Sequence, residues 1–301
     1  MKILAPYFKL TDNAVHLLEP LNLKMLLRIE FTKRAASIFV LFLLLCPHAF
    51  ATWSVLAVSQ ISGRVVIASA TCLALEPPQT LMKIQAVVVP GKGVAAAQAL
   101  LDPSGANQKL IFEELKKETP PDEILRLLRA GDPNIEMRQF GIVDLEGRSG
   151  AFSGNATNAV STTVRGSIAA EKIFFSIQGN FLRNGDVVLE AANAFRAANG
   201  TVTDRVMAAM EAADTKGGDS RCTCETEPKP STPRCESKTS QVAYILVADP
   251  WDSSGSSFND GKYNMYLSVT PRSTERYENA NPVKTLRARY NAYIRNRQLI
   301  K

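Results

Sequence analysis

Histidine is the residue type in shortest supply in this sequence. The 301 residues contain two, His16 and His48. Both lie ahead of Thr52, in a segment that we expect to be removed. A chain that begins at Thr52 has no imidazole, which excludes Ser-His-Asp catalysis, Cys-His catalysis and histidine metal ligands. Any nucleophile must then be activated by an amine, a lysine or a carboxylate.

Apolar runs long enough to cross a membrane are also missing. The longest, Ala35–Cys46, is about a dozen residues, short of the roughly 20 that span a bilayer. It follows Lys33 and Arg34 and precedes Ala49 and Ala51, small residues at the two positions that a signal peptidase reads. This order is typical of a secretory signal peptide. We expect cleavage after Ala51, no membrane span afterwards, and a periplasmic or secreted protein; a retained signal anchor is the alternative.

A basic stripe on the folded body is a third absence. The chain has 35 Lys/Arg and 29 Asp/Glu, for a formal charge of +6. Six basic and three acidic residues precede Thr52, and residues 282–301 hold six basic residues and no acid, which leaves the body between them at about −3. Nucleic-acid binding requires positive charge on the folded domain. We therefore expect no nucleic-acid partner.

Cysteine is scarce but even in number after cleavage, with Cys72, Cys222, Cys224 and Cys235 remaining. An even number in an exported chain predicts disulfides. Cys222 and Cys224 are too close to bond each other without strain. We expect Cys72 to pair with one of them and Cys235 with the other. Three cysteines within fourteen residues leave zinc as the alternative, although we expect no metal and no cofactor.

Cleavage after Ala51 would place the hydroxyl of Thr52 beside a free α-amine. The pKa of an α-amine is about 7.7–8.0, so part of it is neutral at pH 7 and can accept a proton. Nucleophile and base would then share one residue, which is the arrangement of N-terminal threonine catalysis. The alternative is that Thr52 is only one of the small residues that can follow a signal peptide.

Hydrophobic periodicity predicts an α+β chain. We expect strands at 52–59, 65–72, 84–89, 138–144, 150–153, 173–177, 242–247 and 263–269, and helices at 107–118, 122–129, 187–198, 203–213 and 282–299. Strands that alternate with helix pairs indicate layers of each kind. The expected organisation is an N-terminal extension with the signal peptide over 1–51, a domain over 52–250, and an extension over 251–301 that ends in a basic helix dispensable for folding.

Several segments resemble one family in the same order. Thr52–Val58 looks like the Thr-Phe-Ser-Ile-Val-Ala opening of the family called domain of unknown function 1028, whose members resemble N-terminal nucleophile (Ntn) hydrolases. The resemblance covers about 52–250 and continues through Ala68-Ser69 with Cys72, Ala97–Ala99, Arg138–Asp144, Ala151–Gly154, Ser176–Asn180 and Gly217–Cys222. It implies the four-layer αββα sandwich of the Ntn hydrolases, with the terminal residue at a cleft between the sheets.

Five residues are candidates for a site. Thr52 would be the nucleophile, and Asn180 would donate to an oxyanion unless it merely forms a turn with the preceding glycine. Asp219 would hold the α-amine by a charge-assisted hydrogen bond, with a helix-end turn as the alternative. Ser69 and Gln98 are candidates for substrate binding, and each also has a structural role as its alternative.

Together these residues predict an exported amidohydrolase that cleaves a C–N amide bond. The expected partner is a small amide or peptide substrate, with cell-envelope material as the first choice, and a homo-oligomer is left open. A non-catalytic periplasmic or envelope binding module that keeps the sandwich is the alternative, because Ala70 stands where many relatives carry a basic residue. A third reading is an envelope interaction protein that acts through the basic C-terminal helix.

Overall fold

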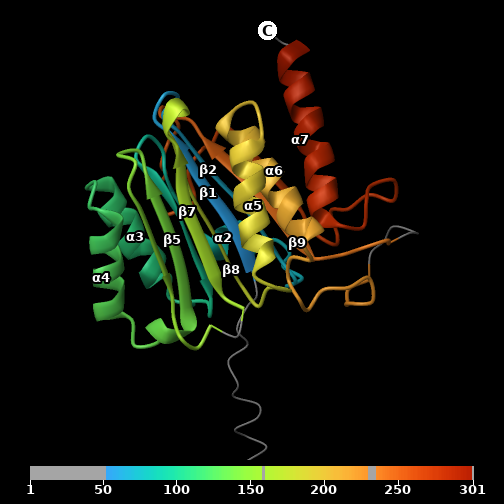
Figure 1. Cartoon of the computed structure of the whole chain (residues 1–301), viewed down its shortest axis with the longest axis horizontal. Helices are drawn as coiled ribbons and strands as arrows, with labels where there is room; N and C mark the ends of the chain where they lie inside the picture. The colour runs from blue at the N-terminus through green and yellow to red at the C-terminus, as the bar shows by residue number, and fades with distance from the viewer. Residues whose placement is uncertain (1–51, 158–159, 230–234, 300–301) are drawn as a thin grey trace, which may run out of the picture. The chain divides into compact units, whose positions relative to one another are not determined.

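The computed structural model describes residues 52–157, 160–229 and 235–299, within a compact unit over Ala49–Lys301. The expected signal peptide and its cleavage positions, Ala49 and Ala51, lie outside the described residues. The predicted α+β class is confirmed, since two antiparallel sheets and several helices make up the unit (Figure 1). No helix in the described ranges is long and apolar enough to cross a membrane.

The larger sheet has six strands in the order β10-β9-β2-β1-β8-β7. Its members are β1 (Thr52–Ser59), β2 (Arg64–Thr71), β7 (Thr162–Ile168), β8 (Ile173–Asn180), β9 (Val242–Ala248) and β10 (Met265–Val269). Every neighbouring pair is antiparallel. Strand β1 lies inside this sheet between β2 and β8, and all of its residues are buried.

The smaller sheet has four strands in the order β3-β4-β5-β6, again antiparallel. Its members are β3 (Ala86–Val89), β4 (Gly93–Ala99), β5 (Arg138–Asp144) and β6 (Ser149–Ser153). A buried apolar cluster from both sheets, which includes Leu56, Ile67, Val94 and Tyr244, fills the space between them. The two sheets therefore pack face to face.

Helices cover the outer face of each sheet (Figure 1). Helices α3 (Ala106–Lys116) and α4 (Pro121–Gly131) share an apolar cluster with the smaller sheet. Helices α5 (Asp186–Ala197), α6 (Val202–Thr215) and α7 (Pro282–Leu299) share another with the larger sheet. A short helix, α2 (Leu81–Gln85), precedes β3 and contributes to the cluster between the sheets.

The alternation of side chains along β1 decides which of them face the smaller sheet. Trp53, Val55 and Ala57 belong to the cluster beneath the helices, whereas Leu56 and Val58 belong to the cluster between the sheets. Because successive strand residues point to opposite faces, Thr52 lies on the face that is turned toward the smaller sheet. The first residue of the strand thus points into the space between the sheets.

Three elements differ from the sequence prediction. The run expected as a strand over 84–89 begins inside helix α2, and the strand starts only at Ala86. Strand β4 occupies an alanine-rich stretch for which no strand was expected. Strand β7 was not expected either, because its residues are partly exposed and include few apolar side chains.

Helix α7 is anchored in the core although its charge is basic. Val283, Leu286 and Tyr290 are buried in the cluster beneath the helices, and Arg287 forms an ion pair with Glu211 of α6 at 2.6 Å. This packing counts against the expectation that the helix is dispensable for folding.

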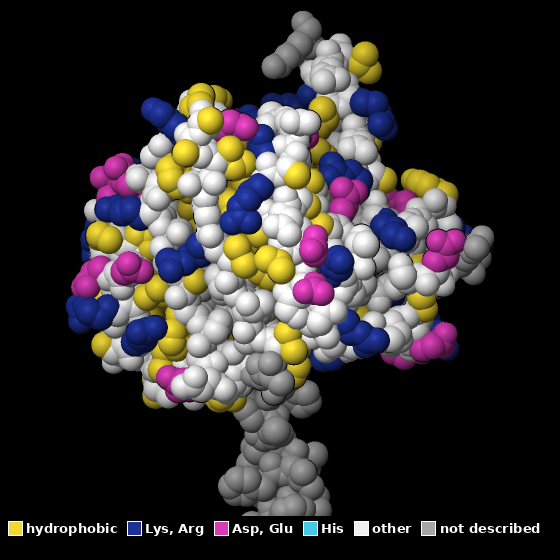
Figure 2. Space-filling view, in the orientation of Figure 1, with side chains coloured by type: hydrophobic (Ala, Val, Ile, Leu, Met, Phe, Trp, Pro, Cys, Tyr) yellow, Lys and Arg dark blue, Asp and Glu magenta, His cyan; other side chains and the backbone are white. Residues whose placement is uncertain are grey.

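On the face shown in Figure 2, basic and acidic side chains are interspersed over the body.

Both disulfides follow the predicted pattern. Cys72 pairs with Cys222, and Cys224 pairs with Cys235. The first bond joins the end of β2 to the segment after α6 across a separation of 150 residues, and the second closes a loop with a separation of 11. Disulfides of this kind persist in oxidising compartments, so they are compatible with an extracellular location.

Candidate functional site

Thr52 begins β1 with a neighbour on each side. It pairs with Thr71 of β2 and with Asn180 of β8, and the three side chains share the face between the sheets. The Thr52 hydroxyl donates to Thr71 Oγ1 at 3.4 Å, and the residue is 2% exposed in the full chain. The candidate nucleophile therefore lies at the end of the central strand, in a polar corner of the space between the sheets.

Gln98 of β4 contacts Thr52 from the opposite sheet. Its Nε2 donates to the Thr52 carbonyl oxygen at 3.2 Å and to Gln139 Oε1 at 2.7 Å. Its Oε1 accepts from Ser54 Oγ at 2.8 Å and from Gln85 Nε2 at 2.7 Å. Both amide hydrogens and both lone pairs are thus used within the protein, which favours the structural alternative over substrate binding.

Gln139 of β5 links the same network to β8. Its Nε2 donates to the Gly179 carbonyl oxygen and to Ser153 Oγ, both at 2.9 Å. Its Oε1 accepts from Gln98 and, at 3.0 Å, from Asn180 Nδ2. The other amide atom of Asn180, Oδ1, is buried and has no hydrogen-bond partner among the described residues.

The network returns to the larger sheet through Gln178. Its Nε2 donates to Ser54 Oγ at 2.6 Å, and its Oε1 accepts from Ser176 Oγ at 2.9 Å. A Cβ at Gly141 of β5 would lie 2.3 Å from Gln178 Oε1. Only a glycine at position 141 therefore leaves room for this glutamine between the sheets.

Tyr244 of β9 closes the network at its other side. Burial raises the pKa of this tyrosine well above its usual value, so the hydroxyl stays protonated at neutral pH and donates to Gln85 Oε1 at 3.1 Å.

Sequence reasoning singled out Gln98 and Asn180 but missed Gln85, Gln139 and Gln178. Two of these, Gln139 and Gln178, lie inside the segments that carry the family resemblance, which is the signal that could have found them.

Asp219 and Ser69 have defined partners. Asp219 accepts from the backbone N–H of Cys72 at 2.8 Å and forms a side-on ion pair with Arg221, at 2.8 and 3.1 Å. It thereby fixes the end of β2 next to Thr71. Ser69 is fully buried and donates to the Trp53 carbonyl oxygen at 2.6 Å, so its hydroxyl ties β2 to β1.

A small pocket borders Thr52. Its remaining wall is mostly apolar, formed by Leu73, Leu81, Ile84, Gln85, Ala97, Gln98, Ala99 and Leu101. Within the described residues, no group of three or more Cys, His, Asp or Glu side chains is arranged to hold a metal ion. The side chains next to Thr52 are the hydroxyl of Thr71 and the amides of Gln98 and Asn180.

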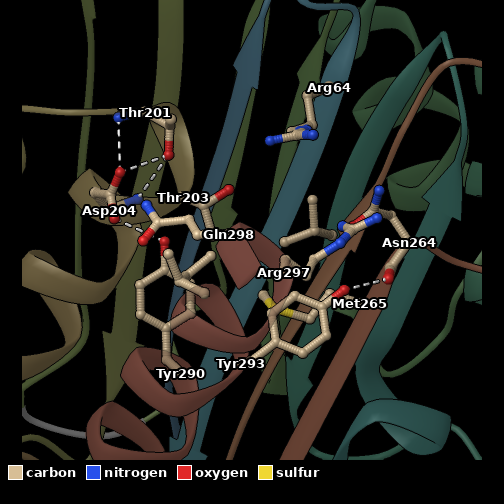
Figure 3. Close-up of a pocket in the computed structure, with 12 residues that line it drawn as sticks. Arg64, Thr201, Thr203, Asp204, Asn264, Met265, Tyr290, Tyr293, Arg297 and Gln298 are labelled. Carbon is tan, nitrogen blue, oxygen red and sulfur yellow. Dashed lines mark hydrogen bonds between the residues drawn. The ribbon is translucent and has the colours of Figure 1, made fainter. Parts of the chain in front are cut away.

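A larger pocket lies at the other end of the larger sheet (Figure 3). One of its lining residues, Arg64, pairs with Ser59 at the far end of β1, and an eight-residue strand is roughly 23 Å long. Arg64 pairs with Asp249 at 2.6 Å, and Arg297 donates to Asn264 Oδ1 at 2.7 Å. Asn264 in turn donates to Asp249, so the two arginines are tied to one buried carboxylate.

A second carboxylate balances the charge of that pocket. Asp204, in the first turn of α6, accepts from Tyr290 at 2.7 Å and from Thr201. Burial works against its ionised form, but the hydrogen bonds from Tyr290 and Thr201 outweigh that effect and hold the pKa of Asp204 below its usual value. Two arginines and two aspartates cancel, so this pocket offers no excess charge to a ligand.

The chain belongs to a family that has no assigned function. A model described as "Family of unknown function (DUF1028)" matches residues 52–226, which is more than half of the chain, and the match begins at Thr52. This confirms the family part of the resemblance noted in the sequence.

A solved structure is similar in fold. The crystal structure of a protein from Silicibacter pomeroyi, itself described as DUF1028, matches with a TM-score of 0.58 and 20% identity, covering 80% of this chain and 88% of that chain. At this identity the likeness concerns the fold alone. No curated protein matches the chain.

Proposed function

We propose that this protein is an exported amidohydrolase of the Ntn type, with Thr52 as its nucleophile. The observation that carries the proposal is the place of Thr52, at the first position of the central strand and on the polar face between the two sheets. The order helices, sheet, sheet, helices is compatible with the four-layer αββα sandwich of that class. The start of the family match at the same residue adds support.

In the proposed reaction, Thr52 Oγ1 attacks the carbonyl carbon of a C–N amide bond. The α-amine of Thr52 accepts the hydroxyl proton and then delivers it to the leaving amine. Water hydrolyses the resulting acyl-enzyme ester and restores the hydroxyl. The Thr71 hydroxyl lies within 3.4 Å of Thr52 Oγ1 and would orient it. The substrate would be a small amide or peptide, with cell-envelope material as the first choice.

The test is the mature N-terminus together with two variants. Mass spectrometry of the exported protein should find Thr52 as the first residue. On an amide that the wild type cleaves, Thr52→Ala should lower turnover by about 10³-fold or more, since the nucleophile is lost. Thr52→Ser keeps a hydroxyl beside the amine and should retain part of the activity. A different N-terminus, or full activity in Thr52→Ala, would contradict the proposal.

A non-catalytic binding module is the second candidate. The family resemblance implies a basic residue at position 70, where this chain has Ala70, and the carboxylate of Asp219 is already paired with Arg221. These features favour a site that lacks an activating charge. This candidate predicts ligand binding that survives Thr52→Ala without any turnover in the wild type.

A further inference from the structure

The amide network around Thr52 has a fixed direction, because two of its acceptors are backbone carbonyls. A carbonyl oxygen can only accept, so the Gln139 atom at 2.9 Å from the Gly179 oxygen must be its NH₂ group. The Gln98 atom at 3.2 Å from the Thr52 oxygen must likewise be NH₂. These two contacts assign the amides independently of each other, and both leave Gln139 Oε1 facing inward as an acceptor.

This direction decides the orientation of Asn180. The group that faces Gln139 Oε1 has to be a donor, so Asn180 turns its Nδ2 toward Gln139 at 3.0 Å. Its Oδ1 then points away from Gln139. The oxygen is fully buried and has no partner among the described residues. A buried acceptor without a donor costs free energy, because it has lost its hydrogen bond to water, so a donor for this atom is expected in the working protein.

The register identifies that donor. Asn180 and Thr52 are direct partners across β8 and β1, and both side chains lie on the face between the sheets. Facing residues in antiparallel strands have Cβ atoms about 4.5–5.5 Å apart, so the amide group of Asn180 lies next to Thr52. Cleavage before Thr52 would convert its backbone nitrogen from an amide with one hydrogen into an amine with two or three.

We infer that Asn180 Oδ1 accepts a hydrogen bond from the free α-amine of Thr52 and holds this base in position. The role of this contact in catalysis rests on the proposed function, whereas the hydrogen bond itself is inferred independently of it. Asn180 then acts as an acceptor for the base, whereas the sequence suggested a donor to an oxyanion. Neutral side chains face this corner from the other strands: Thr71 from β2, Gln98 from β4 and Gln139 from β5. The nearby charges of Asp219 and Arg221 pair with each other.

The experiment measures the pKa of the α-amine in protein that begins at Thr52. The protein is made as a fusion whose removal leaves Thr52 first, and the rate of N-terminal acetylation is followed against pH by mass spectrometry of the terminal peptide. Asn180→Leu removes the acceptor at similar volume. Since a hydrogen bond favours the charged ammonium more than the neutral amine, this variant should lower the amine pKa by about one unit.

A second variant and a control complete the design. Asn180→Asp puts a carboxylate beside the ammonium and should raise the pKa of the amine, which gives a result of opposite sign if the leucine variant does not fold. Ile177→Val lies on the same strand but on the face beneath the helices, away from the amide network, and should leave the pKa of the amine unchanged. An amine pKa that is equal in wild type, Asn180→Leu and Asn180→Asp would overturn the inference.

The readout separates this inference from the proposed function. No substrate is needed for the titration, so a shift in the amine pKa supports the contact even if Thr52→Ala proves that Thr52 is not the nucleophile. Conversely, if Asn180→Leu lowers kcat and leaves the amine pKa where it was, Asn180 is an oxyanion donor. The inference then fails while the amidohydrolase proposal stands.

Discussion

At the scale of single residues, the space between the sheets is organised by neutral amides. Gln98 makes four hydrogen bonds, to β1, β5 and helix α2, and Gln139 makes five, to β4, β6, β8 and Ser161. A buried hydrogen-bond network holds its side chains in one arrangement when every polar atom has a partner. An atom without a partner costs free energy. Here the single open atom of the Gln139–Asn180 pair, Asn180 Oδ1, lies opposite Thr52, where the proposed chemistry occurs.

Gly141 offers a test of whether the amide network requires the observed spacing between the two sheets. Gly141→Ala would place a methyl group 2.3 Å from Gln178 Oε1, and overpacking of this kind costs about 1–3 kcal/mol. We expect the free energy of unfolding to fall by that amount in denaturant titration. Gly131→Ala at the end of α4 is the matched control, since apart from its chain neighbours and its own helix backbone nothing lies within 4 Å of the added carbon. Equal stability of the two variants would count against tight packing at Gln178.

The sequence identified single members of this site but not their pairing. Thr52 followed from the expected cleavage position, and Gln98 and Asn180 followed from the family resemblance. Their partner Gln139 was not singled out, because a glutamine inside an apolar run has the same sequence appearance whether it is buried or exposed. Its role depends on Gly179, 40 residues away in sequence, and no local pattern encodes such a contact.

At the scale of elements, amphipathic and strongly apolar segments were predictable. The strand Thr52–Ser59 and the four helices on the two outer faces from α3 to α6 were expected close to their observed bounds. Strand β7 was missed because this edge strand has only two large apolar side chains, Val164 and Ile168, among Thr, Arg, Gly and Ser. Strand β4 was missed because alanine has low strand propensity, although small side chains suit a strand that is buried on both faces.

Helix α7 gives a prediction at the same scale. Ending the chain after Asn281 removes Val283, Leu286 and Tyr290 from the core, and burial of three such side chains contributes at least about 4 kcal/mol. This truncated protein should unfold at much lower temperature than the whole chain, or fail to fold. Ending the chain after Ile294 keeps those three side chains in place; the described residues that it removes, 295–299, are exposed, so stability should change little. A stable protein that ends at Asn281 would restore the view that the helix is dispensable.

At the scale of the whole molecule, the two disulfides close loops of very different length. In the chain-entropy model, a separation of 150 residues is worth about 5 kcal/mol and a separation of 11 about 3 kcal/mol. Replacing Cys72 and Cys222 together by serine should therefore destabilise the protein more than replacing Cys224 and Cys235. Denaturant titration of the two double variants checks the order, and the reverse order would show that local packing outweighs loop closure.

The central claim is that removal of the segment before Thr52 creates the reactive group. The most direct measurement is covalent labelling by an electrophile that acylates hydroxyl nucleophiles, followed by mass spectrometry of the N-terminal peptide. Protein that begins at Thr52 should carry the adduct on Thr52. Protein that retains Ala51 should not, because an amide nitrogen cannot act as a base at neutral pH. Equal labelling of both forms, or no labelling of Thr52 in either, would contradict the claim.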